Sequence, residues 1–298
     1  MKIFMNGTLI EQAKAVVSAY DHGFLYGIGL FETFRTYGGR AFLLQQHLDR
    51  LADGCGQLRI EPGLSAPDVE RQISELLQAN GLADAYFRLT VTAGPNQLGL
   101  PSGEYEEPTI ILYVKPLPPV DPVLEQRGKP LLQLRTARNT PEGAYRFKSL
   151  HYMNNYLAKI ELSSLLAKPP ISTAGTDASP PEGLMLTEQG FLAEGIVSNL
   201  FFIRGGCLYT PSLATGILPG ITRAYVLELA AKQRIPVQEG LYTWGDLLSA
   251  DEVFLTNSIQ ELVPVGALID ADLNRSDKTP GPITRQLLHH YRKEANNL

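Results

Sequence analysis

A proline-dense stretch near the middle of the chain limits how the polypeptide can fold. Residues 115–122 read Lys-Pro-Leu-Pro-Pro-Val-Asp-Pro. Because proline fixes φ and has no backbone N–H, neither a helix interior nor a central strand can continue through this stretch. Such a composition is typical of an extended spacer. We therefore expect a linker at 116–122 between a small N-terminal domain at 1–115 and a larger C-terminal domain at 123–298.

The patterns on both sides of the spacer predict a mixed α+β fold. An Asn6-Gly7 pair is a strong hairpin signal. Before the spacer, apolar periodicity predicts strands at 30–37, 41–44, 86–92 and 109–114, and helices at 44–58 and 67–79. After it, the expected elements are strands at 131–137 and 253–255 and helices at 150–166, 222–232 and 282–294. The Pro-, Ser-, Thr- and Gly-rich residues 168–183 are expected to form a mobile surface loop.

Composition indicates a globular protein and excludes several partners. With 298 residues, 44% hydrophobic and 19% charged, the chain can bury a large core. A net charge of −5 without any basic run argues against nucleic acid and anionic membranes. The N-terminus turns polar too soon for a signal peptide, and no apolar stretch is long enough to span a bilayer. Cys55 and Cys207 are too few for a disulfide framework and are expected to be buried. We expect a cytoplasmic protein that acts on a small molecule.

Lys148 lies in an unusual setting for a lysine. Most lysines are solvated surface charges. Here Phe147, Leu150, Tyr152 and Met153 surround it in sequence and would desolvate its ammonium group. Desolvation lowers the pKa of an amine towards that of a usable nucleophile. The segment therefore makes Lys148 a candidate Schiff-base lysine.

Glu194 lies in the apolar stretch Leu-Ala-Glu-Gly-Ile-Val. Burial of a lone carboxylate is costly, so Glu194 needs a partner. A buried arginine or a backbone turn would serve, and so would the protonated nitrogen of a pyridine ring. Ser198 and Asn199 follow; they could reach a cofactor, although capping a turn is the commoner role for Asn199.

The segment Leu218–Arg223 opens a predicted helix. Helix N-termini present unpaired N–H groups and the positive end of the dipole, which suits phosphate. Gly220 would allow close approach, Ile221 and Thr222 begin the helix, and the Thr222 hydroxyl adds a donor. An ordinary Pro-Gly turn before a helix gives the same pattern.

Two further segments carry candidate ligand contacts. Arg50, on the first predicted helix, could clamp phosphate oxygens, although an exposed helical arginine is commoner. Thr256, Asn257 and Ser258 end a predicted buried strand, where they could bind a ligand or form a turn. Gly27-Ile28-Gly29 is no dinucleotide loop because Glu32 holds the third glycine position and a strand follows. No P-loop, no Gly-x-Ser-x-Gly elbow and no paired His/Cys metal spacing occurs, so we expect no metal.

An amine for an aldehyde, a carboxylate for a ring nitrogen and donors for a phosphate are together what pyridoxal 5'-phosphate requires. From about Met1 to Leu288 the chain resembles the fold-type IV family of pyridoxal-phosphate enzymes. The resemblance implies a small α/β domain, a larger β-barrel-like domain with flanking helices, and a homodimer. It implies that Lys148 forms the Schiff base and that Glu194 is the partner of the ring nitrogen. The phosphate positions that it implies are Arg50, Ile221, Thr222 and Thr256.

Within that family the sequence looks most like the 4-amino-4-deoxychorismate lyases. Three features carry this resemblance: Thr33 after Glu32, the Thr256-Asn257-Ser258 triplet, and a segment 92–99 without the Arg-x-His pair of D-amino-acid transaminases. Two positions depart from the pattern of these lyases: Ile28 replaces a frequent acidic residue, and His151 occupies a position that is often asparagine. The implied reaction gives 4-aminobenzoate and pyruvate, a step of folate biosynthesis. Weaker candidates for substrate contacts are Tyr26, Thr33, Asn257 and Ser258.

Two alternatives stay open at this stage. A branched-chain or D-amino-acid transaminase would use the same cofactor residues. A non-catalytic ligand-binding protein could share the fold, because fold does not determine function. The presence of both Lys148 and Glu194 favours an enzyme.

Overall fold

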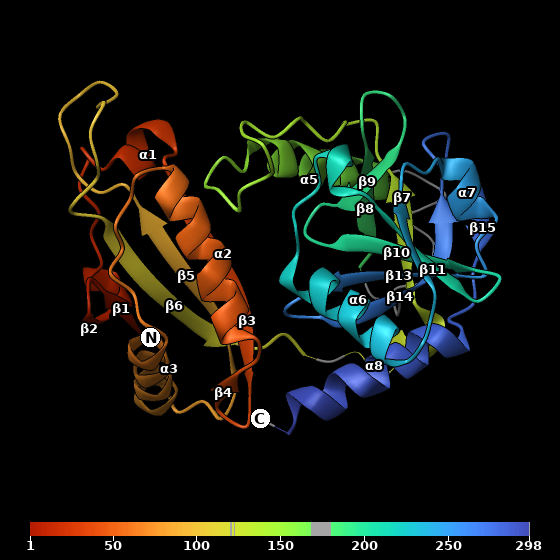
Figure 1. The fold of residues 1–298 in the computed structure, drawn as a ribbon, viewed down its shortest axis with the longest axis horizontal. Helices are drawn as coiled ribbons and strands as arrows, with labels where there is room; N and C mark the ends of the chain where they lie inside the picture. The colour runs from red at the N-terminus through yellow and green to blue at the C-terminus, as the bar shows by residue number, and fades with distance from the viewer. Residues whose placement is uncertain (120, 122, 168–179, 298) are drawn as a thin grey trace. The chain divides into compact units, whose positions relative to one another are not determined.

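The computed structural model describes residues 1–119, 121, 123–167 and 180–297, which form two compact units (Figure 1). The first unit comprises Met1–Pro119, Phe147–His151 and Ala295–Leu298. The second comprises Val120–Arg146 and Tyr152–Glu294. The chain thus leaves the second unit after Arg146, gives a short segment containing Lys148 to the first unit, and returns at Tyr152.

The first unit is built on an antiparallel sheet with the strand order β2-β1-β6-β5-β3-β4. Its strands are β1 (Lys2–Met5), β2 (Thr8–Glu11), β3 (Gly29–Tyr37), β4 (Arg40–Ala41), β5 (Ala85–Thr92) and β6 (Thr109–Pro116). Asn6 and Gly7 both have positive φ, 48° and 75°, which confirms the predicted hairpin turn between β1 and β2.

Helices α2 (Leu44–Gln57) and α3 (Ala66–Asn80) cover one face of this sheet, as Figure 1 shows. The unit also contains the short helix α1 (His22–Tyr26) and a 3-10 turn at Gln12–Lys14. Alternate strand residues point towards α2 and α3 and form the core, among them Phe34, Phe87 and Leu89, all without measurable exposure. Apolar residues of the helices at three- and four-residue spacing complete it, so periodicity predicted both helices correctly. The other face of the sheet carries Thr33 and Arg88, directly opposite each other on β3 and β5.

The Lys148 segment is extended rather than helical. Lys148 O accepts from Phe31 N at 2.9 Å, Leu150 N donates to Gly29 O at 3.0 Å, and Ser149 bridges Leu30. The segment can pair there because β4 covers only the far end of β3. The helix expected from Leu150 therefore begins later, as α5 (Met153–Leu166).

The second unit contains a mixed sheet of strands in the order β12-β11-β10-β13-β14-β7-β8-β9, with β15 added to β14. The strands are β7 (Lys129–Gln133), β8 (Glu182–Leu186), β9 (Leu192–Gly195), β10 (Asn199–Arg204), β11 (Cys207–Pro211), β12 (Val237–Gly240), β13 (Glu252–Asn257), β14 (Glu261–Ile269) and β15 (Arg275–Asp277). Although β9 ends this order, it also lies against β10 and β11. The sheet therefore curls, as expected for a β-barrel-like domain.

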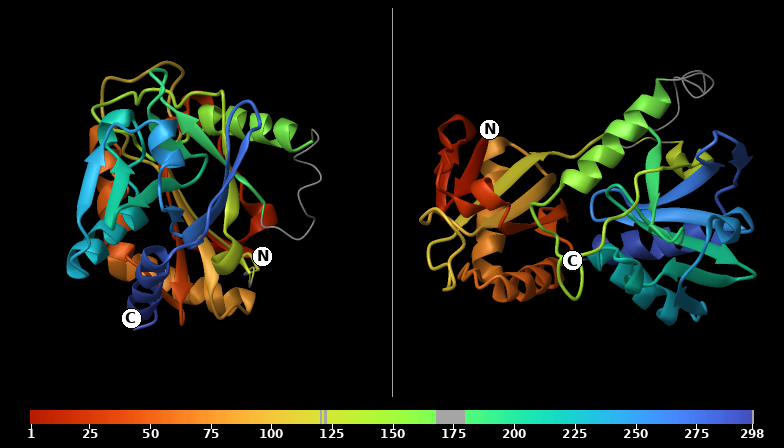
Figure 2. Two further views of the ribbon diagram at one scale, coloured as in Figure 1. Left: turned by 90° about the vertical axis from the view of Figure 1, so that its right-hand side faces the viewer. Right: turned by 90° about the horizontal axis from the view of Figure 1, so that it is seen from above.

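Helices flank this curled sheet: α4 (Leu124–Arg127), α5, α6 (Ile221–Lys232), α7 (Trp244–Leu248) and α8 (Pro282–Ala295), with a 3-10 turn at Leu213–Thr215. The main core contains Leu131 from β7 and both Leu200 and Phe202 from β10. In the right-hand view of Figure 2, α5 (green) runs along the outside of the strands of its unit. No helix in the described residues combines the length and apolar character that a membrane span needs.

The mixed α+β class is confirmed, and several expected boundaries are wrong. Leu44 begins α2 instead of ending a strand, because Leu43 adopts a left-handed conformation that breaks the hairpin. Strand β7 ends at Gln133, and β6 extends to Pro116. Of the loop expected at 168–183, residues 168–179 lie outside the described residues, and its last two form the start of β8. Cys207 is only half-buried. We keep 1–115 and 123–298 as proposed domain limits, with residues 120 and 122 of the linker outside the described chain.

Candidate active site

Glu194 is a buried carboxylate at the end of β9, with only 4% of the residue exposed. Arg138 Nε donates to its Oε1 at 2.8 Å. Its Oε2 accepts from Leu218 N at 3.1 Å and from Asn199 Nδ2 at 3.2 Å. A carboxylate offers about four lone-pair positions, so these three donors leave one position for a ligand. Of the partners that the sequence left open for Glu194, the structure shows a buried arginine, Arg138.

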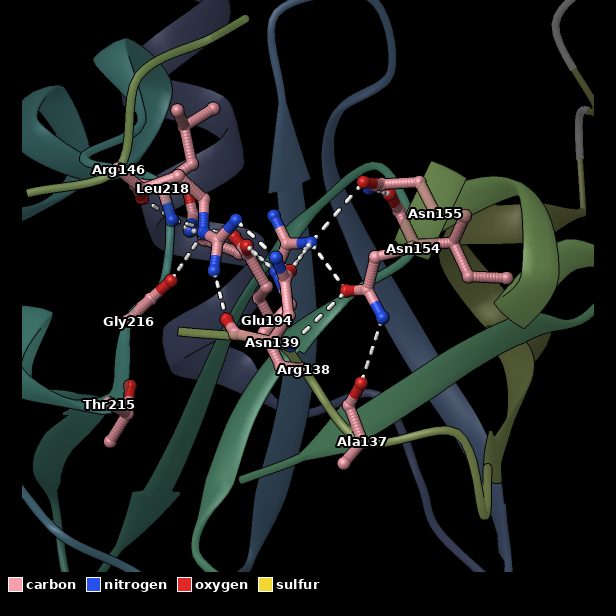
Figure 3. Close-up of polar contacts among 12 residues, drawn as sticks. Ala137, Arg138, Asn139, Arg146, Asn154, Asn155, Glu194, Thr215, Gly216 and Leu218 are labelled. Carbon is pink, nitrogen blue, oxygen red and sulfur yellow. Dashed lines mark hydrogen bonds and ion pairs between the residues drawn. The ribbon is translucent and has the colours of Figure 1, made fainter. Parts of the chain in front are cut away.

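Arg138 connects Glu194 to the first turn of α5 (Figure 3). Its Nη1 donates to Asn154 Oδ1 at 2.7 Å and to Asn155 Oδ1 at 3.2 Å. The amide nitrogens of both asparagines donate in turn to backbone carbonyls, of Ala137 and Ile196 respectively. These bonds fix the orientation of each amide, so the oxygens face the guanidinium group. Each of the two amides is therefore paired through both its oxygen and its nitrogen.

Arg146 is a second buried guanidinium in the same unit. It donates to Gly216 O at 2.5 Å and to the carbonyl of Asn139, and thereby ties together the segments at 139 and 216 (Figure 3). Burial and the nearby positive charge of Arg138 lower the pKa of Arg146 to about 10, although Glu194 opposes this. Arg146 stays protonated at neutral pH and clamps the loop that leads into Leu218.

The predicted phosphate residues of the second unit meet at the start of α6. Gly220 is the N-cap residue, and a Cβ there would lie 2.0 Å from Asn199 Oδ1. Thr222 Oγ1 lies 3.2 Å from Ser258 Oγ. Asn199 and Thr256 are cross-strand neighbours on β10 and β13. Glycine, free helix N–H groups and hydroxyls are thus gathered within one unit.

Two buried hydroxyls of this region have no partner among the described residues: Ser198 Oγ and Thr256 Oγ1. Buried polar groups are nearly always hydrogen-bonded, so an unpaired one calls for a ligand or water. Both belong to the residues expected to contact the cofactor. The donor set therefore fits a bound phosphopyridoxyl group, with Glu194 available to its ring nitrogen.

Arg50 lies in the first unit and forms a bidentate pair with Glu32. Its Nε and Nη2 donate to the two carboxylate oxygens at 2.8 and 2.6 Å. His47 Nδ1 lies 2.6 Å from Glu32 Oε2. Burial raises the pKa of Glu32, but the charge of Arg50 and the His47 hydrogen bond outweigh it and bring the pKa to about 2. Glu32 thus fixes the guanidinium of Arg50; the phosphate contact itself stays a prediction.

Lys148 also belongs to the first unit and is half-buried. Its Nζ lies 4.8 Å from the centre of the Phe31 ring, and the Arg88 guanidinium lies 3.5 Å from the centre of the same ring. The sequence neighbours Tyr152 and Met153 were expected to shield the amine, yet they are 38% and 67% exposed. Phe31 adds an aromatic contact to Lys148 that the order of the sequence did not predict, because the extended segment places Lys148 beside β3.

The weaker substrate candidates divide between the units. Tyr26 Oη accepts from Gly99 N at 2.9 Å, and Thr33 lies opposite Arg88. Asn257 accepts from Ile259 N and Gln260 N, which is the turn role left open by the sequence.

The sequence reasoning missed Arg138, Arg146, Asn154 and Asn155. The only signals were a pair of asparagines at a helix start and two arginines in a loop, neither of which names a partner.

Comparison with known proteins shows the family to which the chain belongs. The family model for amino-transferase class IV matches residues 29–268. The aminodeoxychorismate lyase of Bacillus subtilis is 40% identical over 99% of this chain and 95% of its own length.

Solved structures share the fold over nearly the whole chain. The 4-amino-4-deoxychorismate lyase of Pseudomonas aeruginosa has a TM-score of 0.81 and 30% identity, with 99% of both chains covered. A branched-chain amino acid aminotransferase from T.th., complexed with N-(5'-phosphopyridoxyl)-L-glutamate, has a TM-score of 0.82 and 29% identity, covering 99% of this chain and 94% of that one. The chain therefore belongs to the class IV aminotransferase family of pyridoxal-phosphate-dependent enzymes.

Proposed function

We propose that this protein is a 4-amino-4-deoxychorismate lyase that forms 4-aminobenzoate and pyruvate. The observation that carries the proposal is the 40% identity to the Bacillus subtilis lyase over 99% of the chain. Thr33 and the Thr256–Ser258 triplet agree with it. Folate biosynthesis would be the pathway, and the cytoplasm the compartment.

The proposed roles follow the chemistry of each side chain. Bound pyridoxal phosphate supplies an aldehyde that condenses with amines and a cationic ring that withdraws electrons. Lys148 would hold the aldehyde as a Schiff base, and Glu194 would accept a hydrogen bond from the protonated ring nitrogen. Arg50, Ile221, Thr222 and Thr256 would hold the phosphate, with Ser198, Asn199 and Gly220 shaping the site around it.

Lys148 is also the proposed proton carrier. The free amine of Lys148 would take the proton from the amine-bearing ring carbon of the substrate. The same proton would pass to the methylene carbon of the enolpyruvyl group as the ring C–O bond breaks. The electrons of the broken C–H bond complete the aromatic ring, those of the C–O bond leave with pyruvate, and no water is consumed.

A transaminase is the second candidate, favoured by the likeness to the branched-chain amino acid aminotransferase from T.th.. It would share the first proton removal at Lys148 and differ in where the proton returns. The deciding experiment incubates the purified protein with aminodeoxychorismate and follows 4-aminobenzoate fluorescence. In parallel, branched-chain and D-amino acids are offered with 2-oxoglutarate. Turnover of amino acids without 4-aminobenzoate would replace the lyase proposal by the transaminase.

Lys148→Ala tests the site itself. The variant should lose both the Schiff-base absorbance and turnover, whereas Lys159→Ala, an exposed lysine on α5, should keep both. Retention of colour and turnover in Lys148→Ala would remove Lys148 from the site. If wild type binds the cofactor normally but turns over none of these substrates, the result would support a non-catalytic ligand-binding protein.

The protein is further proposed to be a homodimer. On α5, Met153, Tyr156, Leu157 and Ile160 are 67%, 61%, 50% and 45% exposed. Their spacing places them on one helix face, and an exposed apolar stripe of this kind marks an association surface. Light scattering should give twice the chain mass, and Tyr156→Glu should shift it towards the monomer. A monomeric wild type would contradict the proposal.

A further inference from the structure

The buried pair Arg138–Glu194 has a geometry that a simple ion pair would not need. Both side chains are 6% exposed, yet only Nε of Arg138 contacts the carboxylate. Arginine usually grips a carboxylate through two parallel N–H bonds. Here Nη1 donates to the side-chain oxygens of Asn154 and Asn155. The single contact leaves one lone-pair position on Glu194 unused.

The position of Arg138 is fixed from outside the pair. Asn154 and Asn155 are held by the carbonyls of Ala137 and Ile196 at 2.9 and 2.6 Å. Ile196 follows Glu194 by two residues, so the network closes on the same stretch of chain that carries the carboxylate. Because buried side-chain networks with all members paired are rigid, Arg138 has little freedom to turn away.

The opposite edge of the carboxylate is fixed as well. Glu194 Oε2 accepts from Leu218 N and from Asn199 Nδ2, and Asn199 Nδ2 also donates to Leu218 O at 3.0 Å. Donors on both sides hold the carboxylate of Glu194 in one orientation. The direction of the carboxylate is thus set before any ligand binds.

We propose that Arg138 is a positioning residue that fixes the direction of the Glu194 carboxylate and so sets how strongly the cofactor's ring nitrogen is held protonated. This inference rests on the proposed cofactor role of Glu194. Arg138 acts through Glu194 and touches no substrate. Loss of Arg138 leaves Glu194 buried with two donors, so the carboxylate is aligned less well.

The test compares wild type with Arg138→Gln, Glu194→Gln and the double variant. The first readout is the dissociation constant for pyridoxal phosphate, from titration of the cofactor-free proteins. Arg138→Gln should weaken binding by roughly 10- to 100-fold, the size expected for a lost hydrogen bond to a charged group. Arg135→Gln is the matched control: Arg135 lies three residues earlier, 73% exposed, paired with Asp272 on the surface. It should bind as wild type.

The second readout is the pH at which the Schiff-base absorbance changes. A ring nitrogen that is less firmly protonated withdraws less electron density, so the imine becomes more basic. The absorbance transition of Arg138→Gln should move to higher pH, and that of Arg135→Gln should stay. A merely structural role of Arg138 would lower the thermal midpoint without moving this transition.

The double variant decides whether Arg138 acts through Glu194. If it does, Arg138→Gln/Glu194→Gln binds cofactor no more weakly than Glu194→Gln alone. If the two substitutions instead weaken cofactor binding independently, so that their fold-losses multiply in the double variant, the inference is overturned. It is also overturned if Arg138→Gln keeps the cofactor affinity and the absorbance transition of wild type. If Arg138→Gln does not fold by circular dichroism, Arg138→Lys replaces it. Lysine keeps the charge but cannot reach Glu194 and the asparagines together, so the same two shifts are expected at smaller size.

Failure of this inference is distinguishable from failure of the proposed function. A wild-type protein that neither binds pyridoxal phosphate nor forms 4-aminobenzoate refutes the function. A wild-type protein that does both, with an unaltered Arg138→Gln, refutes only the role of Arg138.

Discussion

Replacement of Glu32 by glutamine tests how the first unit stabilises its buried charges. Glu32 is 1% exposed and accepts from Arg50 Nε, Arg50 Nη2 and His47 Nδ1. Its pKa falls from the ordinary 4.5 to about 2. Since one pKa unit corresponds to about 1.4 kcal/mol, ionised Glu32 contributes roughly 3 kcal/mol to folding at pH 7. Glu32→Gln keeps the shape but loses this contribution.

The pH dependence follows from the direction of the shift. A carboxyl whose pKa is lower in the folded protein stabilises it fully above its unfolded pKa, near 4.5. The contribution is lost as the pH falls through about 2. The free-energy gap between wild type and Glu32→Gln should therefore be largest above pH 4.5 and narrow towards pH 2.

Urea unfolding of the cofactor-free protein measures this effect unit by unit. The chain has a single tryptophan, Trp244, on α7 of the second unit. Its fluorescence reports that unit, whereas far-UV circular dichroism reports both. Glu32→Gln should lower the midpoint of the dichroism transition by about 1–3 M urea, because m-values of small domains are about 1–3 kcal/mol per M. The fluorescence transition should move less.

The matched control is Glu75→Gln on α3, where Glu75 pairs with Arg71 at 3.0 Å on the surface. Exposed pairs contribute little, so its unfolding transition should coincide with that of wild type. An unchanged midpoint in Glu32→Gln at pH 7, or a gap that stays constant from pH 4.5 to 2, would refute the reasoning.

Three further predictions concern single positions. Thr256→Val removes a buried hydroxyl that has no partner among the described residues, so the free energy of unfolding of the cofactor-free protein should rise by about 1 kcal/mol while its cofactor affinity falls. The hydroxyl of Thr210 donates to Leu200 O, so the control Thr210→Val should instead lower the thermal midpoint. Gly220→Ala should lower the free energy of unfolding by roughly 1–3 kcal/mol and weaken cofactor binding, because the new Cβ meets Asn199. The control Gly56→Ala, where the space is open, should not lower it. Equal effects of the two substitutions would contradict the close contact at Gly220. Burial lowers the pKa of His47, so stability should decline as the pH falls below 6.5, where unfolded His47 takes up a proton; a pH profile of His47→Gln should lack this decline.

Local sequence patterns predicted most of the secondary structure. Apolar spacing of 3.6 residues gave α2 and α3, and the Asn6-Gly7 pair gave the first hairpin, because both depend on neighbouring residues alone. Prediction failed at Leu43 and at Leu150. In both places a distant constraint decides: the left-handed turn at Leu43, and the pairing of the Lys148 segment with β3.

The site shows the same division. The sequence marked Lys148, Glu194 and the start of α6 as candidates, because an isolated charge in an apolar stretch and a glycine before a helix are local features. The partners were not. Arg138 reaches Glu194 across 56 positions of the chain, and Glu32 meets His47 and Arg50 only when α2 packs on β3.

The amino-acid sequence by itself indicated the mixed fold class from residue types and short-range order. Through its resemblance to fold-type IV enzymes it also indicated the cofactor family and the candidate site residues. The tertiary structure decided which charges are paired, which hydroxyls are left without partners, and that Phe31 contacts Lys148. Those properties depend on burial and on contacts between residues far apart in the chain, which exist only after the strands and helices have packed.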